Sequence, residues 1–308
     1  MQENLQKTIN SVVTFQGVGL HSGNTSNVRL LPAKENQGII FKRVDLKENN
    51  IIEADYKNVS SAKLCTTLEN SSGIKVSTVE HLLAALYIVG VDNALIEIDN
   101  QEIPIMDGSS KNFVETLLKT GTKNLNQNRK FLKVLKKVEL EDSGRKISIE
   151  PSNLDFEVNF TLNYSNEIIG QQKNTINLHN DDLENVYSSR TFCLFDDIEK
   201  IKKLGLAKGG SLENAIVVNH EKIMNENGLR NEKEFVNHKI LDLVGDFLLS
   251  GYRILGKVHC QEGGHQLSNM FLRKFLKSNT SYEMIELNNN ESLKKTQVDQ
   301  QIKLAVNA

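Results

Sequence analysis

Residues 234–246 read Glu234-Phe235-Val236-Asn237-His238-Lys239-Ile240-Leu241-Asp242-Leu243-Val244-Gly245-Asp246 and place polar groups inside an apolar helical pattern. The apolar periodicity predicts a helix over about 232–250, which Gly251 ends with a left-handed cap. His238 and Asp242 are four residues apart, so they share one helix face with Cβ atoms roughly 5–6 Å apart. Imidazole nitrogen with carboxylate oxygen suits a catalytic zinc ion better than a structural one. A hydrogen-bonded pair without metal is the alternative for this segment.

Composition limits the classes of protein to consider. The chain has 308 residues, enough for two domains, with 39% apolar residues, 25% charged residues and a formal net charge of −2. Lysine and arginine are spread along the chain, so we expect no nucleic-acid partner. Cys65, Cys193 and Cys260 lie far apart, which fits a reducing compartment better than a disulfide framework.

The sequence shows no pattern of a targeting or membrane-spanning segment. The first residues lack the basic and apolar regions of a signal peptide. The longest apolar run, Leu82–Val89, is far shorter than a membrane span. These features predict a soluble, cytoplasmic protein.

Two halves of the chain are separated by the polar residues 121–130, which we interpret as a linker. Each half runs from predicted strands into predicted helices, which is typical of an α+β fold with sheet-on-helix layers. From Ser278 onward the sequence is polar and weakly patterned, and we expect a peripheral tail. Strands are predicted over 28–31, 38–43, 94–98, 131–134 and 156–162, and further helices over 78–89 and 112–119.

A second histidine lies at the start of the first-half helix. Ser77 and Glu80 have the spacing of a capping box, in which Glu80 bonds back to the cap amide and His81 is a partly buried helix residue. Alternatively, His81 binds a metal ion and Glu80, in the first helical turn, acts as the base for an attacking water. The local sequence leaves both interpretations open.

A third histidine follows two glycines in Gly263-Gly264-His265. A tight glycine turn can bring an imidazole close to a ligand. A surface turn with a solvated histidine is the alternative, and the local sequence favours it. Near the N-terminus, the glycines of Gly17-Val18-Gly19-Leu20-His21-Ser22-Gly23 match neither the dinucleotide fingerprint nor a Walker loop, which excludes a nucleotide-loop interpretation.

Seven motifs occur in order between about Thr8 and Leu276: Gly17-Val18-Gly19-Leu20-His21-Ser22-Gly23, Leu64-Cys65-Thr66-Thr67, Ser77-Thr78-Val79-Glu80-His81-Leu82, Pro104-Ile105-Met106-Asp107-Gly108-Ser109, Arg190-Thr191-Phe192, Glu234-Phe235-Val236-Asn237-His238-Lys239 with Asp242 and Asp246, and Gly264-His265. Together they closely resemble the UDP-3-O-acyl-N-acetylglucosamine deacetylases, zinc amidases that commit carbohydrate to lipid A synthesis in Gram-negative bacteria.

The resemblance implies two similar βααβ sandwich domains whose helices pack face to face, with the active site between them. The first domain would span residues 1–126 and the second 127–277, followed by a polar tail over 278–308. An insertion near 194–218 in the second domain would form an apolar passage for the acyl chain. A simpler interpretation of its apolar side chains is that they form the core-facing side of a short helix.

The resemblance also implies a catalytic mechanism, in which one zinc ion per chain, or Fe²⁺ in the cell, supports hydrolysis of the acetamide. His81, His238 and Asp242 would be the metal ligands and leave a fourth position for water. Glu80 would be the general base. The oxyanion would be stabilised with help from Thr191 and His265, and His265, oriented by Asp246, is the second candidate for the proton transfer.

Substrate contacts follow from the same resemblance. Tyr164 would stack on the uracil, although Asn163 stands where some relatives have an acid. Cys65 has a second interpretation as a buried structural cysteine. The residues implied to contact substrate are Lys239, Phe192, Leu20, Cys65, Tyr164 and Gly210.

The implied partner is a lipidated UDP-sugar, and we expect a monomer. Peripheral contact with the inner membrane stays open because the substrate carries an acyl chain. Two alternative functions remain: a zinc amidase for another substrate class and a non-catalytic metal-binding module. The chain lacks His-Glu-x-x-His, which argues against the common metalloprotease geometry, and three convergent ligands favour catalysis over a structural ion.

Overall fold

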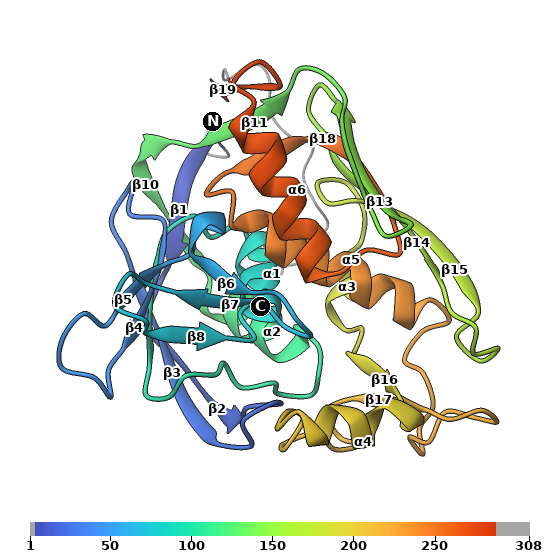
Figure 1. The fold of residues 1–308 in the computed structure, drawn as a ribbon. Helices are drawn as coiled ribbons and strands as arrows, with labels where there is room; N and C mark the ends of the chain where they lie inside the picture. The colour runs from blue at the N-terminus through green and yellow to red at the C-terminus, as the bar shows by residue number, and fades with distance from the viewer. Residues whose placement is uncertain (1–3, 288–308) are drawn as a thin grey trace.

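The computed structural model describes residues 4–287 (Figure 1). The fold is α+β, as predicted, with two βααβ sandwich halves. Helices lie between the two main sheets, and the halves pack face to face through α1 (Glu80–Val89) and α5 (Glu234–Leu248). The other helices are α2 (Lys111–Thr120), α3 (Glu184–Tyr187), α4 (Phe195–Lys203), α6 (His265–Lys277) and the 3-10 helix η1 (Tyr56–Asn58).

The first half contains a five-stranded sheet in the order β2-β3-β9-β4-β5, in which β4 and β9 are parallel. A small sheet, β6-β7-β8, is inserted between β5 and α1. The strands are β2 (Val13–Val18), β3 (Thr25–Pro32), β4 (Ile39–Arg43), β5 (Ile51–Glu53), β6 (Val59–Ser61), β7 (Thr67–Glu69), β8 (Lys75–Ser77) and β9 (Ala94–Ile98).

The second half contains a seven-stranded sheet in which β18 pairs with three strands, β11, β13 and β14. A short parallel pair, β16-β17, flanks α4 in the predicted insertion. The strands are β11 (Lys130–Val134), β12 (Val138–Asp142), β13 (Arg145–Pro151), β14 (Phe156–Asn163), β15 (Gln171–Asn177), β16 (Phe192–Leu194), β17 (Ile216–Val218), β18 (Arg253–Gln261) and β19 (Tyr282–Glu286).

Two sequence predictions need correction. The predicted linker at 121–130 contains β10 (Thr122–Asn128), which pairs antiparallel with β1 (Leu5–Ile9). Its side chains are mostly exposed, so a polar sequence is compatible with a strand there. The chain also continues as β19 beyond residue 277, paired with β11, where a tail was predicted. Residues 288–308 of the predicted tail lie outside the described residues.

The central helices are buried on nearly all sides, and apart from the polar residues of the candidate site their sequences are largely apolar. Every residue of α1 is buried, and in α5 every residue except Lys239 is buried. Gly245 lets the two helices approach closely: a Cβ atom there would lie 2.1 Å from the carbonyl oxygen of Glu80. The first turn of α1 therefore lies directly against the last turn of α5.

A charged cluster joins the far end of α1 to the second half. Asp92 accepts hydrogen bonds from Arg129 at 2.7 Å and from Arg253 at 3.4 Å, and Arg253 also donates to the Tyr87 carbonyl at 2.7 Å. The Tyr87 hydroxyl lies 3.4 Å from Nε2 of His179. Burial, followed by the charge of Arg253, lowers the pKa of His179 to about 4.

We expect Gly245→Ala to lower the free energy of unfolding by about 1–3 kcal/mol, because the new methyl group overlaps the Glu80 carbonyl. An alanine without this overlap would stabilise a helix by about 1 kcal/mol. Urea denaturation measures the difference. Gly210→Ala is the control, because its Cβ would meet its nearest atom at an ordinary 3.4 Å. A Gly245→Ala protein as stable as the parent would contradict the close contact.

His179→Gln should change how stability depends on pH. An unfolded histidine has a pKa near 6.5, and the folded value is about 4. Between these values only the unfolded chain binds the proton, so stability falls as pH drops from about 7 to 4, by up to about 3 kcal/mol. In the variant, the free energy of unfolding should fall less between about pH 7 and 4 than in the parent, as measured by urea denaturation at a series of pH values. The exposed His259→Gln is the control, and parallel curves for all three proteins would refute the prediction.

Candidate metal centre and active site

Three buried side chains converge where α1 meets α5. His81 lies in the first turn of α1, and His238 and Asp242 lie one turn apart on α5. Oδ1 of Asp242 is 3.5 Å from Nε2 of His81 and 3.4 Å from Nε2 of His238. The structure thus brings together the three predicted ligands, one from the first half and two from the second.

These separations fit a tetrahedral cation site. Bonds of about 2.0–2.1 Å to zinc put neighbouring ligand atoms about 3.3–3.4 Å apart. Oδ1 of Asp242 has no hydrogen-bond partner within residues 4–287. Nδ1 of His238 lies 3.1 Å from the Ser189 carbonyl oxygen, which favours a proton on Nδ1 and a lone pair on Nε2.

The protonation states also suit metal binding. Burial lowers the pKa of His238 to about 3, so its imidazole is neutral at physiological pH. Burial opposes ionisation of Asp242, but His238 and Lys239 outweigh it and hold the pKa of this carboxyl well below its usual range. Lys239 Nζ donates to Oδ2 of Asp242 at 2.7 Å, which leaves Oδ1 for a cation. The donor set therefore fits a divalent metal.

Glu80 lies beside this cluster, and the capping-box prediction is wrong. Ser77 belongs to β8, and α1 begins at Glu80 without a side-chain cap. Oε2 of Glu80 instead accepts a hydrogen bond from the Thr66 amide at 3.0 Å. The carboxylate thus bonds to an amide distant in sequence, that of Thr66, and not to the amide at the start of its own helix. Burial raises the pKa of Glu80, and the nearby His265 and His81 oppose that shift.

His265 is buried at the start of α6, so the surface-turn alternative is wrong. Its Nδ1 lies 2.9 Å from Asp246, and its Nε2 lies 3.6 Å from Oε1 of Glu80 and 3.9 Å from Oδ2 of Asp242. Burial alone would lower the pKa of His265. The carboxylates of Asp246, Glu80 and Asp242 outweigh burial and raise the pKa to about 10, which makes the ring a cation at neutral pH.

A polar cleft of about 340 Å³ contains these groups. Lys63, Arg145 and Lys239 add positive charge to its lining. The predicted residues that line it are Glu80, His81, His238, Asp242, His265, Thr191, Phe192, Leu20, Tyr164 and Lys239.

An apolar pocket of about 330 Å³ adjoins the cleft, and the two share Leu20, His21, Leu64, Thr191 and Phe192 in their linings. Side chains of α4 form part of its wall, as does the predicted Gly210. No residue of α4 is buried, and Phe195 is 49% exposed. The alternative of ordinary core packing for this helix is therefore wrong.

The segment carrying Thr191 and Phe192 is held by the start of α5. Glu234, which is fully buried, accepts hydrogen bonds from Arg190 at 2.8 Å and from the Arg230 amide at 2.6 Å. The Phe192 ring makes an edge contact with Tyr164, with centroids 5.7 Å apart. Cys65 is buried, and its neighbour Leu64 lines the cleft in its place.

Besides Lys63 and Arg145 in the cleft lining, three residues that support the site from outside the lining carried no predicted role. Thr66 donates its hydroxyl to Asp246 at 2.7 Å and its amide to Glu80. Ser189 acts through a backbone carbonyl, which leaves no side-chain signature in the sequence. Glu102 is buried and accepts from the Thr78 hydroxyl at 2.9 Å. Thr66 lies in one of the quoted motifs, as does Thr78, the partner of Glu102. Membership of these motifs was the only sequence feature that could have pointed to Thr66 and Glu102.

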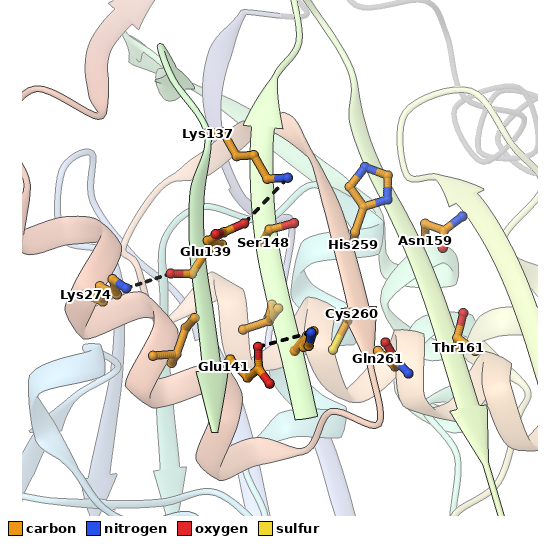
Figure 2. A pocket seen from close by; sticks show the side chains of 13 residues that line it. Lys137, Glu139, Glu141, Ser148, Asn159, Thr161, His259, Cys260, Gln261 and Lys274 are labelled. Atoms are coloured by element: carbon orange, nitrogen blue, oxygen red, sulfur yellow. Dashed lines mark hydrogen bonds and ion pairs between the residues drawn. The ribbon is translucent and has the colours of Figure 1, made fainter. Parts of the chain in front are cut away.

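A larger hollow of about 530 Å³ lies on the second sheet, across β12, β13, β18 and β14 (Figure 2). Its charged groups mostly satisfy one another. Lys137 lies 3.6 Å from Glu139, Lys146 lies 3.1 Å from Glu141, and Lys274 donates to the Glu139 carbonyl. The predicted ligands and the predicted base are absent from its lining, so it is not the candidate active site.

Comparison with known proteins agrees with this geometry. A family model described as UDP-3-O-acyl N-acetylglycosamine deacetylase matches residues 6–277. The chain is 40% identical over 291 residues to the UDP-3-O-acyl-N-acetylglucosamine deacetylase of Actinobacillus succinogenes, covering 94% of this chain and 95% of that one. It is 41% identical over 281 residues to the protein of the same name from Aliivibrio fischeri, covering 90% and 92%.

Within residues 4–287, none of the helices combines the length and the apolar character needed to cross a membrane. The extent of the family match and the identity to its members confirm the resemblance inferred from the motifs. The chain therefore belongs to the UDP-3-O-acyl N-acetylglycosamine deacetylase family and is a deacetylase, a hydrolase of an amide bond.

Proposed function

We propose that this protein hydrolyses the acetamide of UDP-3-O-acyl-N-acetylglucosamine to acetate and UDP-3-O-acyl-glucosamine, the committed step of lipid A biosynthesis. The observation that carries the proposal is the convergence of His81, His238 and Asp242. The Nε2 atoms of the two histidines lie 3.5 Å and 3.4 Å from Oδ1 of Asp242. Glu80 and His265 lie beside these three residues. The names of the family and of its members supply the substrate class.

A zinc ion held by these three residues would supply Lewis acidity, which polarises an amide carbonyl and acidifies water. Iron(II) is the alternative, because it also accepts imidazole and carboxylate ligands. Three protein ligands leave room for chemistry, whereas a structural zinc site uses four. All of the proposed ligands come from one chain, which supports activity as a monomer.

Glu80 is the proposed general base. Its Oε2 is engaged by the Thr66 amide, so Oε1 is the atom available to accept a proton from the attacking water. Burial raises the pKa of this carboxyl, which brings its basicity closer to neutral pH. The water oxygen adds to the acetamide carbon as Glu80 takes the proton.

His265 is the proposed cation for the next step. Its ring is held by Asp246, which is itself fixed by the Thr66 hydroxyl. The positive imidazole would stabilise the negative charge that develops on the carbonyl oxygen, with help from the Thr191 hydroxyl. As the C–N bond breaks, the sugar nitrogen receives a proton from His265 or from Glu80 and leaves as the amine.

The two adjoining pockets match the two ends of the proposed substrate. Lys63, Arg145 and Lys239 would face the diphosphate in the polar cleft, and Tyr164 would stack on the uracil. The apolar pocket beside α4 would hold the acyl chain. Each methylene buried there would contribute about 0.8 kcal/mol of favourable binding free energy. We also propose the two predicted domains, with the second extended to include β19, working in the cytoplasm.

Metal analysis together with an acetate-release assay on the acylated UDP-sugar tests the proposal. We expect one zinc ion per chain and loss of activity on chelation. His238→Ala should lower zinc affinity by roughly 100-fold or more, because it removes a direct ligand. His220→Ala is the control, since that side chain is 81% exposed. Zinc-replete protein that is inactive on the UDP-sugar but active on another amide would indicate a different amidase.

Glu80→Gln should keep stoichiometric zinc and lose turnover by roughly 10²–10⁴-fold, because the amide cannot accept the proton. Elemental analysis and kcat on the same preparation separate the two effects. Glu69→Gln, a partly exposed carboxylate on β7, should behave like the parent. Full activity of the Glu80 variant would remove this residue from the mechanism.

A further inference from the structure

His21 is a buried histidine whose ring bonds to nothing in the described protein. The residue is only 9% exposed, yet neither Nδ1 nor Nε2 of its ring has a hydrogen-bond partner within residues 4–287. A buried polar group without a partner destabilises the fold. If this side chain only filled space in the fold, an apolar residue could do so without the cost of an unpaired polar group. We therefore expect the imidazole to have a hydrogen-bond partner outside the protein.

The backbone around His21 is fixed even though its ring is unpaired. Glu102 accepts hydrogen bonds from the amides of His21 at 2.8 Å and Ser22 at 2.7 Å, and from the Thr78 hydroxyl. Gly19 packs so closely that a Cβ atom would lie 2.4 Å from the Glu102 carboxylate. This buried carboxylate therefore ties the His21 turn to the segment that leads into Glu80.

The same turn is also tied to the insertion. The Leu20 carbonyl accepts from the Gly209 amide at 3.0 Å, and the His21 carbonyl accepts from the Lys208 amide at 3.3 Å. Both amides belong to the chain between α4 and β17. The imidazole is thus held at a set position relative to the catalytic segment and to the wall of the apolar pocket.

His21 lines both the polar cleft and the apolar pocket. A substrate that occupies both must pass its linkage between sugar and acyl chain through the place where they meet. In the proposed substrate that linkage is an ester on the carbon next to the acetamide. The ester carbonyl is a hydrogen-bond acceptor, and a neutral imidazole carries one N–H donor.

We propose that His21 donates a hydrogen bond to the carbonyl oxygen of this ester and so places the neighbouring acetamide at the metal centre. This assignment rests on the proposed function. It makes His21 a specificity-determining residue that favours an ester-linked chain, because a substrate without the carbonyl would leave the buried imidazole unpaired.

The test compares two substrates of equal chain length, the 3-O-acyl ester and the 3-O-alkyl ether of UDP-N-acetylglucosamine. For the parent protein we expect kcat/KM to favour the ester by roughly tenfold or more. His21→Leu should bring the ratio close to one, and His21→Gln should restore part of it because its amide supplies an N–H donor. Zinc content should be unchanged in both variants.

Ile198→Ala is the matched control, since Ile198 lines the apolar pocket but offers no hydrogen bond. It should lower kcat/KM for ester and ether alike and keep their ratio. Thermal unfolding adds a second readout: His21→Leu should be as stable as the parent or more stable, because it removes an unpaired buried polar group.

An unchanged ester-to-ether ratio in His21→Leu would overturn the assignment. A lower melting temperature of that variant together with an unchanged ratio would make His21 a structural residue. If the zinc-loaded parent protein hydrolyses neither substrate, the proposed function itself fails and this assignment fails with it.

Discussion

The contact between Gly245 on α5 and the Glu80 carbonyl on α1 sets the distance between the two halves of the protein. Because α1 begins at this contact, its first two side chains, Glu80 and His81, lie against the turn of α5 that carries Asp242. A wider separation of the helices would move His81 away from the other two ligands. The absence of a side chain at Gly245 therefore allows the helix contact that brings the three candidate ligands together.

The site contains buried groups of opposite charge, and each charge is stabilised by a neighbour of the opposite sign. Asp242, Asp246 and Glu80 face His265, whose pKa rises to about 10 against the effect of burial. His238 stays neutral in the same space because burial, which lowers its pKa, outweighs the nearby Asp242 carboxylate, which raises it. Two histidines that lie 3.4 Å and 3.9 Å from the Asp242 carboxylate thus reach opposite protonation states, one suited to ligation and one to proton donation.

Strong periodicity made much of the fold predictable. β9 has the predicted bounds, and α1, α2 and α5 lie within two residues of theirs. The three ligands implied by the family resemblance lie close enough together to hold a metal ion. The failures occurred where tertiary contacts outweigh local pattern. β10 is polar because it is exposed, and Glu80 turns to the Thr66 amide instead of capping its own helix. The Ser189 carbonyl could not be predicted, because every residue has one.

Helix α4 contributes no buried residue, so the walls of the apolar pocket are largely separate from the core that holds the candidate metal ligands. Substitutions at Phe195, Ile198 or Ile201 can therefore change the depth of the pocket with little effect on folding. Under the proposed function, preference for chain length could drift from one lineage to another while His81, His238 and Asp242 stay constant.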